Sequence, residues 1–317
     1  MGFTKPNALK KGDTIALISP ASAVSPRRAE VYANYLEGAG YYARIMPHAA
    51  DRLGFLAGAD RERACDLMEA FCDDRVDAIF CIRGGYGALR LLPLIDFETV
   101  ARRPKIFSGF SDITVLHAAF NKLCGFVTFH APMSTAPVGG VNPPPDPFAV
   151  SAQMDMLSGR STRIPVPESY RPKALFHGRG EGLLTGGNLT LLAALAATPY
   201  APVTKGRILV LEDVDEQPYA VDRALQTLKL SGMLSGLAGV VIGDFSTCRG
   251  KNAGDTQTFM DVLADALLPL GIPVICDYPA GHIPNQVTLP MGCRVGMIAE
   301  KGQARIELLE CPVKDAL

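Results

Sequence analysis

Short apolar runs alternate with longer amphipathic stretches over residues 1–135. In the longer stretches the apolar residues recur at helical spacing, so the order is β-α-β-α-β-α-β-α-β. This alternation predicts a parallel sheet covered by helices. Ser25 and Pro26 provide an N-cap and a first-turn proline for the helix after the first strand. The predicted strands cover 14–20, 41–47, 76–82, 105–110 and 126–132.

The alternation stops at residues 136–173, which are rich in Pro, Gly and Ser and are expected to form a linker. A second, smaller and more β-rich domain is predicted over residues 174–317. The predicted fold class is therefore α/β, with the first domain over residues 1–135. The expected strands of the second domain cover 207–214, 237–245, 273–279, 293–300 and 304–310, and its expected helices cover 188–197, 220–230 and 256–270.

The composition favours chemistry on a small molecule or a peptide. The chain has 317 residues, 48% of them hydrophobic, which is enough to bury a large core. Lys and Arg number 31 against 32 Asp and Glu, so the net charge of -1 offers no basic field for nucleic acid or an anionic membrane. The polar start of the chain lacks the apolar core of a secretory signal, and we expect a cytoplasmic protein without membrane spans.

The metal-binding and nucleotide-binding signatures are incomplete. The 8 cysteines are scattered without a C-x-x-C pair, and none of the 5 histidines is paired at i, i+4, so no metal is predicted. The glycine clusters RGGYG (83–87) and GRGEG (178–182) complete neither a dinucleotide fingerprint nor a P-loop. No cofactor is therefore expected, and GRGEG is interpreted as a tight turn.

Two neighbouring strand ends carry candidate chemistry. RGGYG follows the strand 76–82, and at that edge of an open parallel sheet its backbone N–H groups can hold an anion or an oxyanion. Ser111 follows the strand 105–110 and precedes a helix, which is the context of a nucleophile elbow. A helix cap is the alternative interpretation of Ser111, and Asp112 fits a first-turn residue that suits the helix dipole.

A serine nucleophile needs a base and a group that orients the base. His282, between a glycine and Ile283-Pro284, follows the strand 273–279 in a loop that presents its ring. His130 ends the strand 126–132 and remains a competitor. His117 falls within a predicted helix and is interpreted as structural, and His48 and His177 have no supporting pattern.

Glu212 is the best-placed carboxylate, because it is the first acid after the apolar strand RILVL. Asp213 is the alternate. The neighbouring acids Asp215 and Glu216 fit solvated or capping positions.

Six motifs in order make the chain resemble the LD-carboxypeptidase family of serine peptidases, which includes the microcin C immunity proteins. They are K-x-G-D-T-I-A-L-I-S-P near the start, then R-G-G-Y-G, G-F-S-D, T-G-G-N-L, L-E-D-V-D-E and G-H-x-x-N. The resemblance implies a flavodoxin-like or class I amidotransferase-like first domain and a smaller β-rich second domain. It also implies a homodimer.

For the site, the resemblance implies Ser111 as nucleophile, His282 as base and Glu212 as orienting carboxylate. It further implies an oxyanion hole formed by the backbone N–H groups of Gly85 and Asp112. The expected reaction removes the terminal D-Ala from a cytoplasmic murein tetrapeptide through an acyl-enzyme.

Two other functions stay open from the sequence. One is the immunity-protein reaction on an acyl-sulfamoyl nucleotide, whose nucleobase is expected to stack on an aromatic residue. The absence of Trp, the best stacking partner, disfavours this reaction without excluding it, because Tyr or Phe can substitute. The other is a two-domain protein that binds a small molecule without chemistry. Arg83 and Arg90 are candidates for binding the substrate carboxylates, with surface ion pairing as the alternative.

Overall fold

The computed structural model describes residues 2–134, 146–248 and 257–315. Its first sheet has the strand order β11-β5-β4-β3-β1-β2, in which β1 to β5 are parallel and β11 pairs antiparallel with β5. The strands are β1 (Thr14–Ile18), β2 (Tyr42–Ile45), β3 (Ala78–Cys81), β4 (Ile106–Gly109), β5 (Thr128–His130) and β11 (Leu289–Met291).

In the first half of the chain, up to residue 134, helix α1 (Pro26–Gly38) begins where the sequence provides a cap. The Ser25 side chain accepts a hydrogen bond from the backbone of Arg28, and Pro26 occupies the first turn of α1. Buried residues of α1 recur at helical spacing and face the sheet. The helical segments are α1 (Pro26–Gly38), α2 (Asp60–Cys72), η1 (Ala88–Leu94), α3 (Phe97–Arg102), η2 (Ser111–Ile113), α4 (Thr114–Ala119) and η3 (Phe120–Cys124).

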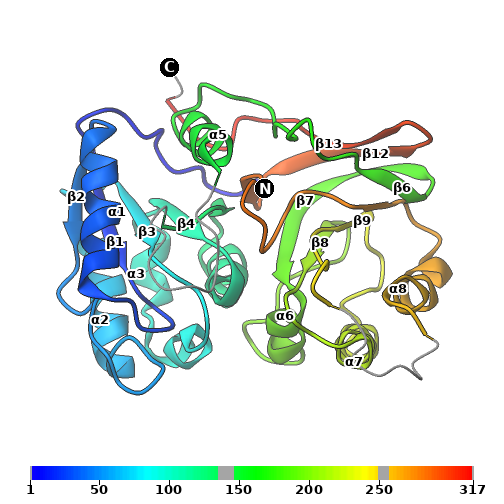
Figure 1. Ribbon diagram of the computed structural model, residues 1–317, viewed down its shortest axis with the longest axis horizontal. Coiled ribbons are helices and arrows are strands. Elements are labelled where there is room, and N and C mark those ends of the chain that lie inside the picture. The colour runs from blue at the N-terminus through cyan, green and yellow to red at the C-terminus, as the bar shows by residue number, and fades with distance from the viewer. Residues whose placement is uncertain (1, 135–145, 249–256, 316–317) are drawn as a thin grey trace.

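The second half forms a mixed sheet of order β13-β12-β7-β8-β9-β10-β6, in which β7, β8, β9 and β10 are parallel. Figure 1 shows the two halves side by side, with α6, α7 and α8 on the same side of the second sheet. The elements are α5 (Pro147–Leu157), β6 (Lys173–Phe176), β7 (Gly178–Asn188), α6 (Leu189–Leu195), β8 (Ile208–Glu212), α7 (Pro218–Leu230), β9 (Gly239–Ile242), α8 (Phe259–Leu267), η4 (Leu268–Leu270), β10 (Val274–Cys276), β12 (Arg294–Glu300) and β13 (Gln303–Leu308).

The interpretation of GRGEG as a tight turn is wrong, because these residues belong to the long strand β7. Its glycines allow neighbouring backbone to approach closely. A Cβ on Gly180 would lie 2.2 Å from the carbonyl oxygen of Ala238, and one on Gly182 would lie 2.5 Å from that of Gly206. The glycines of this strand therefore serve close packing rather than chain reversal.

Besides β7, the elements α3, α5, β6 and β11 were not expected from the sequence. Helix α5 lies in the interval 136–173, where a linker was predicted, and Asp146 caps it by accepting from the backbone of Phe148. Part of that interval, 136–145, lies outside the described residues. Strand β6 pairs with β10, and β11 adds a strand from the second half of the chain to the first sheet. Within the described residues, no helix combines the length and the apolar character needed to cross a membrane.

Candidate active site

Ser111 lies on a sharp turn at the carboxyl end of β4. Its backbone φ is 65°, in the left-handed region that L-residues seldom occupy, and η2 begins at this residue. Gly84, on the loop after β3, lies against it, because a Cβ on Gly84 would be 2.8 Å from the Ser111 Cβ. The strained turn and the missing side chain at Gly84 leave the Ser111 hydroxyl facing the cavity described below.

A hydrogen-bonded chain joins Ser111 to residues of the second half. The His282 Nε2 lies 3.0 Å from the Ser111 Oγ, and the His282 Nδ1 lies 2.8 Å from the Glu212 Oε2. With Glu212 ionised, Nδ1 carries the proton and donates to the carboxylate, and Nε2 accepts from the serine hydroxyl. We call this arrangement the Ser–His–Glu chain.

Glycines make room for the carboxylate of this chain. Glu212 ends β8 and is fully buried. A Cβ on Gly281 would lie 2.7 Å from the Glu212 Oε2, and one on Gly243 would lie 3.1 Å from the Glu212 Cβ. Gly281 has a φ of 116°, which also favours glycine. The glycine before His282 thus lets the imidazole-bearing loop pass directly over the carboxylate.

The pKa values of Glu212 and His282 follow from their burial and from their mutual attraction. Burial raises the pKa of Glu212, although the neighbouring His282 opposes this shift. For His282 burial alone would lower the pKa, but the charge and hydrogen bond of Glu212 outweigh it and the pKa is raised. Glu212 therefore stabilises the protonated imidazole that forms when His282 accepts a proton.

The competing histidines lie in the core. His130 is completely buried, neither of its ring nitrogens has a hydrogen-bond partner among the described residues, and burial lowers its pKa well below the usual value. Its ring packs 5.8 Å from that of Phe110, which in turn lies 4.9 Å from His282. His117 donates from Nε2 to the carbonyl oxygen of Gly109, and burial lowers its pKa to about 4. Within the described residues, neither His130 nor His117 forms a hydrogen bond with Ser111.

Asp213, the alternate carboxylate, is occupied elsewhere. Its oxygens accept hydrogen bonds from the Asn188 side chain at 2.8 Å and from the backbone and hydroxyl of Thr190 at 2.9 and 2.8 Å. It therefore fixes the start of α6, whereas Glu212 contacts the imidazole.

Asp112 anchors the glycine-rich loop after β3. Its side chain is buried and accepts a 2.7 Å hydrogen bond from the backbone of Ala88, and burial raises its pKa to about 6. Asp112 directly follows Ser111 in η2, and Gly85 lines the same cavity as Ser111.

A cavity of about 230 Å³ opens over the Ser–His–Glu chain, between the two halves of the molecule. Arg83 lines it, as expected for a carboxylate-binding candidate. Arg90 does not, because it forms an ion pair with Asp60 at 2.7 Å. The residues that line the cavity are Arg28, Arg83, Gly84, Gly85, Phe110, Ser111, Met133, Ser134, Val214, Asp215, His282, Ile283 and Gln286.

Sequence reasoning missed Arg28 as a cavity residue. Arg28 belongs to the first turn of α1, which follows the end of β1. This position at the carboxyl edge of the sheet was the signal in the sequence that Arg28 could line the cavity. Helix starts at the carboxyl edge of a parallel sheet lie on the same side as the turn that carries Ser111.

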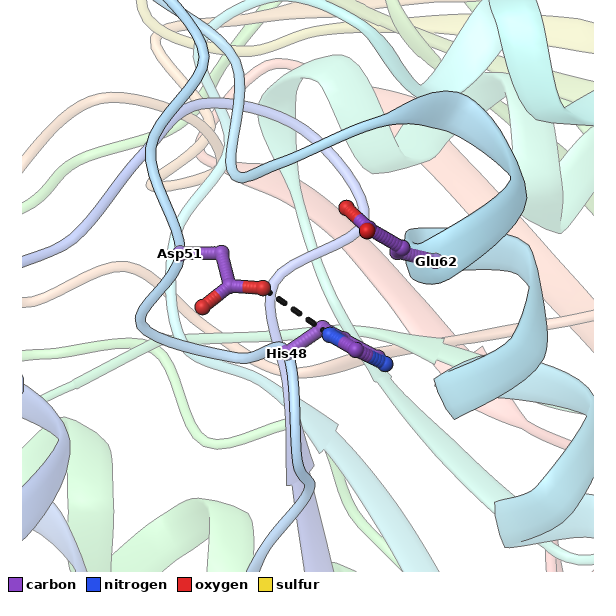
Figure 2. Close-up of side chains that lie close together, drawn as sticks. All are labelled: His48, Asp51 and Glu62. Atoms are coloured by element: carbon purple, nitrogen blue, oxygen red, sulfur yellow. Dashed lines mark hydrogen bonds and ion pairs between the residues drawn. The ribbon is translucent and has the colours of Figure 1, made fainter.

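One further cluster of potential ligands lies away from the cavity. His48, Asp51 and Glu62 offer ligand atoms within 4.8 Å of one another, and Figure 2 shows the His48 ring bonded to Asp51 with Glu62 opposite on α2. His48 Nδ1 lies 2.9 Å from the Asp51 carboxylate, which raises the pKa of the imidazole. Glu62 accepts from the backbone of Ala59 as part of a helix cap. These contacts account for the cluster without a bound ion.

Family models match both halves of the chain. Residues 15–131 match the LD-carboxypeptidase N-terminal domain, and residues 181–297 match the LD-carboxypeptidase C-terminal domain. The chain belongs to the LD-carboxypeptidase family. It is therefore a serine carboxypeptidase, and family membership excludes the interpretation as a non-catalytic binding protein.

Relatives of this LD-carboxypeptidase match it over nearly the full length. A probable murein peptide carboxypeptidase of Bacillus subtilis is 37% identical over 96% of this chain and 94% of its own. The murein tetrapeptide carboxypeptidase of Pseudomonas aeruginosa is 33% identical over 88% of this chain and 91% of its own.

Solved structures support the fold of this LD-carboxypeptidase. A muramoyltetrapeptide carboxypeptidase from Oxalobacter formigenes has a TM-score of 0.83 and 31% identity, covering 95% of this chain and 100% of its own. MccF in complex with glutamyl sulfamoyl guanosine has a TM-score of 0.85 at 22% identity, covering 98% and 99%. The expected architecture, a helix-covered parallel sheet followed by a β-rich α/β half, is confirmed.

Proposed function

We propose that this LD-carboxypeptidase removes the terminal D-Ala from murein tetrapeptides, with Ser111 as nucleophile, His282 as general base and Glu212 as the carboxylate that orients His282. The Ser–His–Glu chain at the floor of the cavity carries the proposal. Murein-peptide relatives at 37% and 33% identity over most of the chain support the substrate class.

In the proposed reaction, the Ser111 Oγ attacks the carbonyl carbon of the bond to D-Ala while His282 Nε2 takes the hydroxyl proton. The N–H groups of Gly85 and Asp112 donate to the oxyanion. His282 then gives its proton to the leaving amine, and D-Ala departs. Water, deprotonated by the same imidazole, attacks the acyl-enzyme and releases the tripeptide and the serine. Glu212 stabilises the imidazolium in both halves of the reaction.

The proposal extends to the setting of the enzyme. We expect it to act in the cytoplasm as a homodimer on peptides released from the cell wall. The family resemblance supports both statements, and light scattering of the purified protein tests the second: a mass of one 33.8 kDa chain contradicts it.

Mass spectrometry of a murein tetrapeptide incubated with the purified protein tests the substrate. We expect loss of D-Ala and no cleavage of the matched peptide that ends in L-Ala. An aminoacyl-sulfamoyl adenosine is the comparison substrate. We expect a lower kcat/KM for it, since the chain offers no Trp to stack its nucleobase. A higher kcat/KM for the nucleotide conjugate would overturn the substrate and leave the roles of the three side chains standing.

A further inference from the structure

Two arginines from separate loops face the cavity that holds Ser111. Arg28 comes from the first turn of α1, which follows β1, and Arg83 comes from the loop after β3. Both are partly buried. Asp215, on the wall formed by the second half, is the acidic side chain among the cavity residues. The wall of the first half is therefore positively charged.

Neither arginine forms an ion pair within the described residues, although other arginines of this half do. Arg28 donates from Nε to the Ser134 hydroxyl at 3.1 Å, and Arg83 donates from Nη1 to the carbonyl oxygen of Ala23 at 3.0 Å. Each guanidinium has five N–H donors, so these neutral acceptors orient it and leave most of its donors for a ligand.

The two positive charges also disfavour each other. Burial lowers the pKa of Arg28, and the charge of Arg83 lowers it further. Like charges in a partly buried cavity cost free energy unless an anion lies between them. A carboxylate matches the planar fork of a guanidinium in both charge and geometry.

The reaction limits where such a carboxylate can lie. A carboxypeptidase that releases one residue acts on a carbonyl carbon only three covalent bonds, or about 4 Å, from the carbon of the terminal carboxylate. The side chains that recognise this group must therefore line the same cavity as the Ser111 hydroxyl. Arg28 and Arg83 are the cationic side chains, other than His282, that line it in the described part of the chain.

We propose that Arg28 and Arg83 together bind the terminal carboxylate of the leaving D-Ala and so restrict the enzyme to free C-termini. This assignment rests on the proposed function, since it names the group that the leaving residue presents. Both arginines act as substrate-positioning residues: they hold the peptide so that its last amide lies over Ser111.

The test compares a murein tetrapeptide with the same peptide ending in a C-terminal amide. The wild-type enzyme should prefer the free acid. Arg28→Met and Arg83→Met should each reduce kcat/KM for the acid by roughly 10- to 150-fold, the range for a hydrogen bond to a charged group. Turnover of the amide should change little, so the preference for the acid should collapse in both variants.

The matched control is Arg27→Met, which removes the same charge from the neighbouring, exposed position of α1. It should leave the acid-to-amide ratio, which is kcat/KM for the free acid divided by kcat/KM for the amide, unchanged. Labelling of Ser111 by a neutral serine-directed probe reports whether each variant retains the folded site. Arg28→Lys and Arg83→Lys keep the positive charge but lose the planar guanidinium, so they should give intermediate acid-to-amide ratios. These variants replace the Met variants in the test if a Met variant fails to fold.

The outcomes separate the two proposals. A wild-type enzyme that releases no D-Ala from the tetrapeptide contradicts the proposed function and this assignment with it. Normal turnover by the wild type, combined with an unchanged acid-to-amide ratio in the Arg28 and Arg83 variants, overturns the assignment alone.

Discussion

The protonation state of His282 controls whether it can accept the proton of Ser111. Glu212 raises the pKa of His282 against the effect of burial. Because the base must be neutral, kcat/KM should fall as the pH drops through this pKa, with a midpoint above the usual histidine value of about 6.5.

Glu212→Gln removes the charge that raises the pKa of His282, so that burial dominates. The midpoint of the kcat/KM profile should move to lower pH, and kcat should fall by up to ~10⁴-fold as the imidazole loses its orienting partner. Rate profiles of wild type and variant from acid to mildly alkaline pH provide the measurement. An unchanged midpoint in the variant would mean that another group titrates.

The different surroundings of His282 and His130 predict different effects when each is replaced by alanine. His282→Ala should abolish turnover in a folded protein, because it removes the side chain that contacts Ser111. His130→Ala should leave turnover measurable and reduce the free energy of unfolding by about 1–3 kcal/mol, since it empties a buried position. Steady-state kinetics and thermal unfolding of both variants decide the matter, and the reverse pattern would assign the base to His130.

At the scale of single elements, the end of β8 and the loop after β10 must pass close to each other to align Glu212 with His282. Gly281→Ala places a methyl group 2.7 Å from the Glu212 Oε2 and should reduce kcat/KM by ~100-fold through displacement of the pair. Gly271→Ala is the control: its φ of 63° is also positive, but nothing lies within 4 Å of the added Cβ.

The control should retain wild-type kinetics and lose only about 1–2 kcal/mol of stability from backbone strain. Equal activity of the two variants would show that close contact at Gly281 is unimportant. Melting curves measure the loss of stability from backbone strain, and kinetic constants measure the effect of displacing Glu212 and His282.

The sequence was informative where a signal is local. The strands and most helices of residues 1–135 follow from periodicity and from caps such as Ser25, although α3 was not expected. The positions of Ser111 and Glu212 at strand ends follow from the same pattern. The choice between His282 and His130 did not follow from local sequence, because His130 ends one strand and His282 follows another. Their hydrogen-bond partners differ only in the folded chain.

Elements that depend on distant partners were missed for a physical reason. Strand β7 contains glycines that weaken any strand signal, yet they are required by the backbone packed against them. Strand β11 is three residues long, with Pro290 in its centre, and exists because β5 presents an edge to it. Neither requirement is visible along the chain.

At the scale of the whole molecule, the two halves are joined through shared structure. The second half supplies β11 to the first sheet, and the backbone N–H of Asn188 donates to the Thr114 hydroxyl at 3.0 Å across the two halves. We therefore expect one cooperative unfolding transition in calorimetry, with equal calorimetric and van't Hoff enthalpies. Two resolved transitions would contradict this coupling.

The central claim is that Ser111 is the nucleophile of a carboxypeptidase reaction, and D-Ala release by Ser111→Ala tests it most directly. The wild type should convert a murein tetrapeptide to the tripeptide, and the variant should do so ~10³- to 10⁶-fold more slowly with nearly unchanged thermal unfolding. A folded Ser111→Ala protein that retains more than about a tenth of wild-type kcat would contradict the assignment, because a serine nucleophile contributes far more than that to the rate.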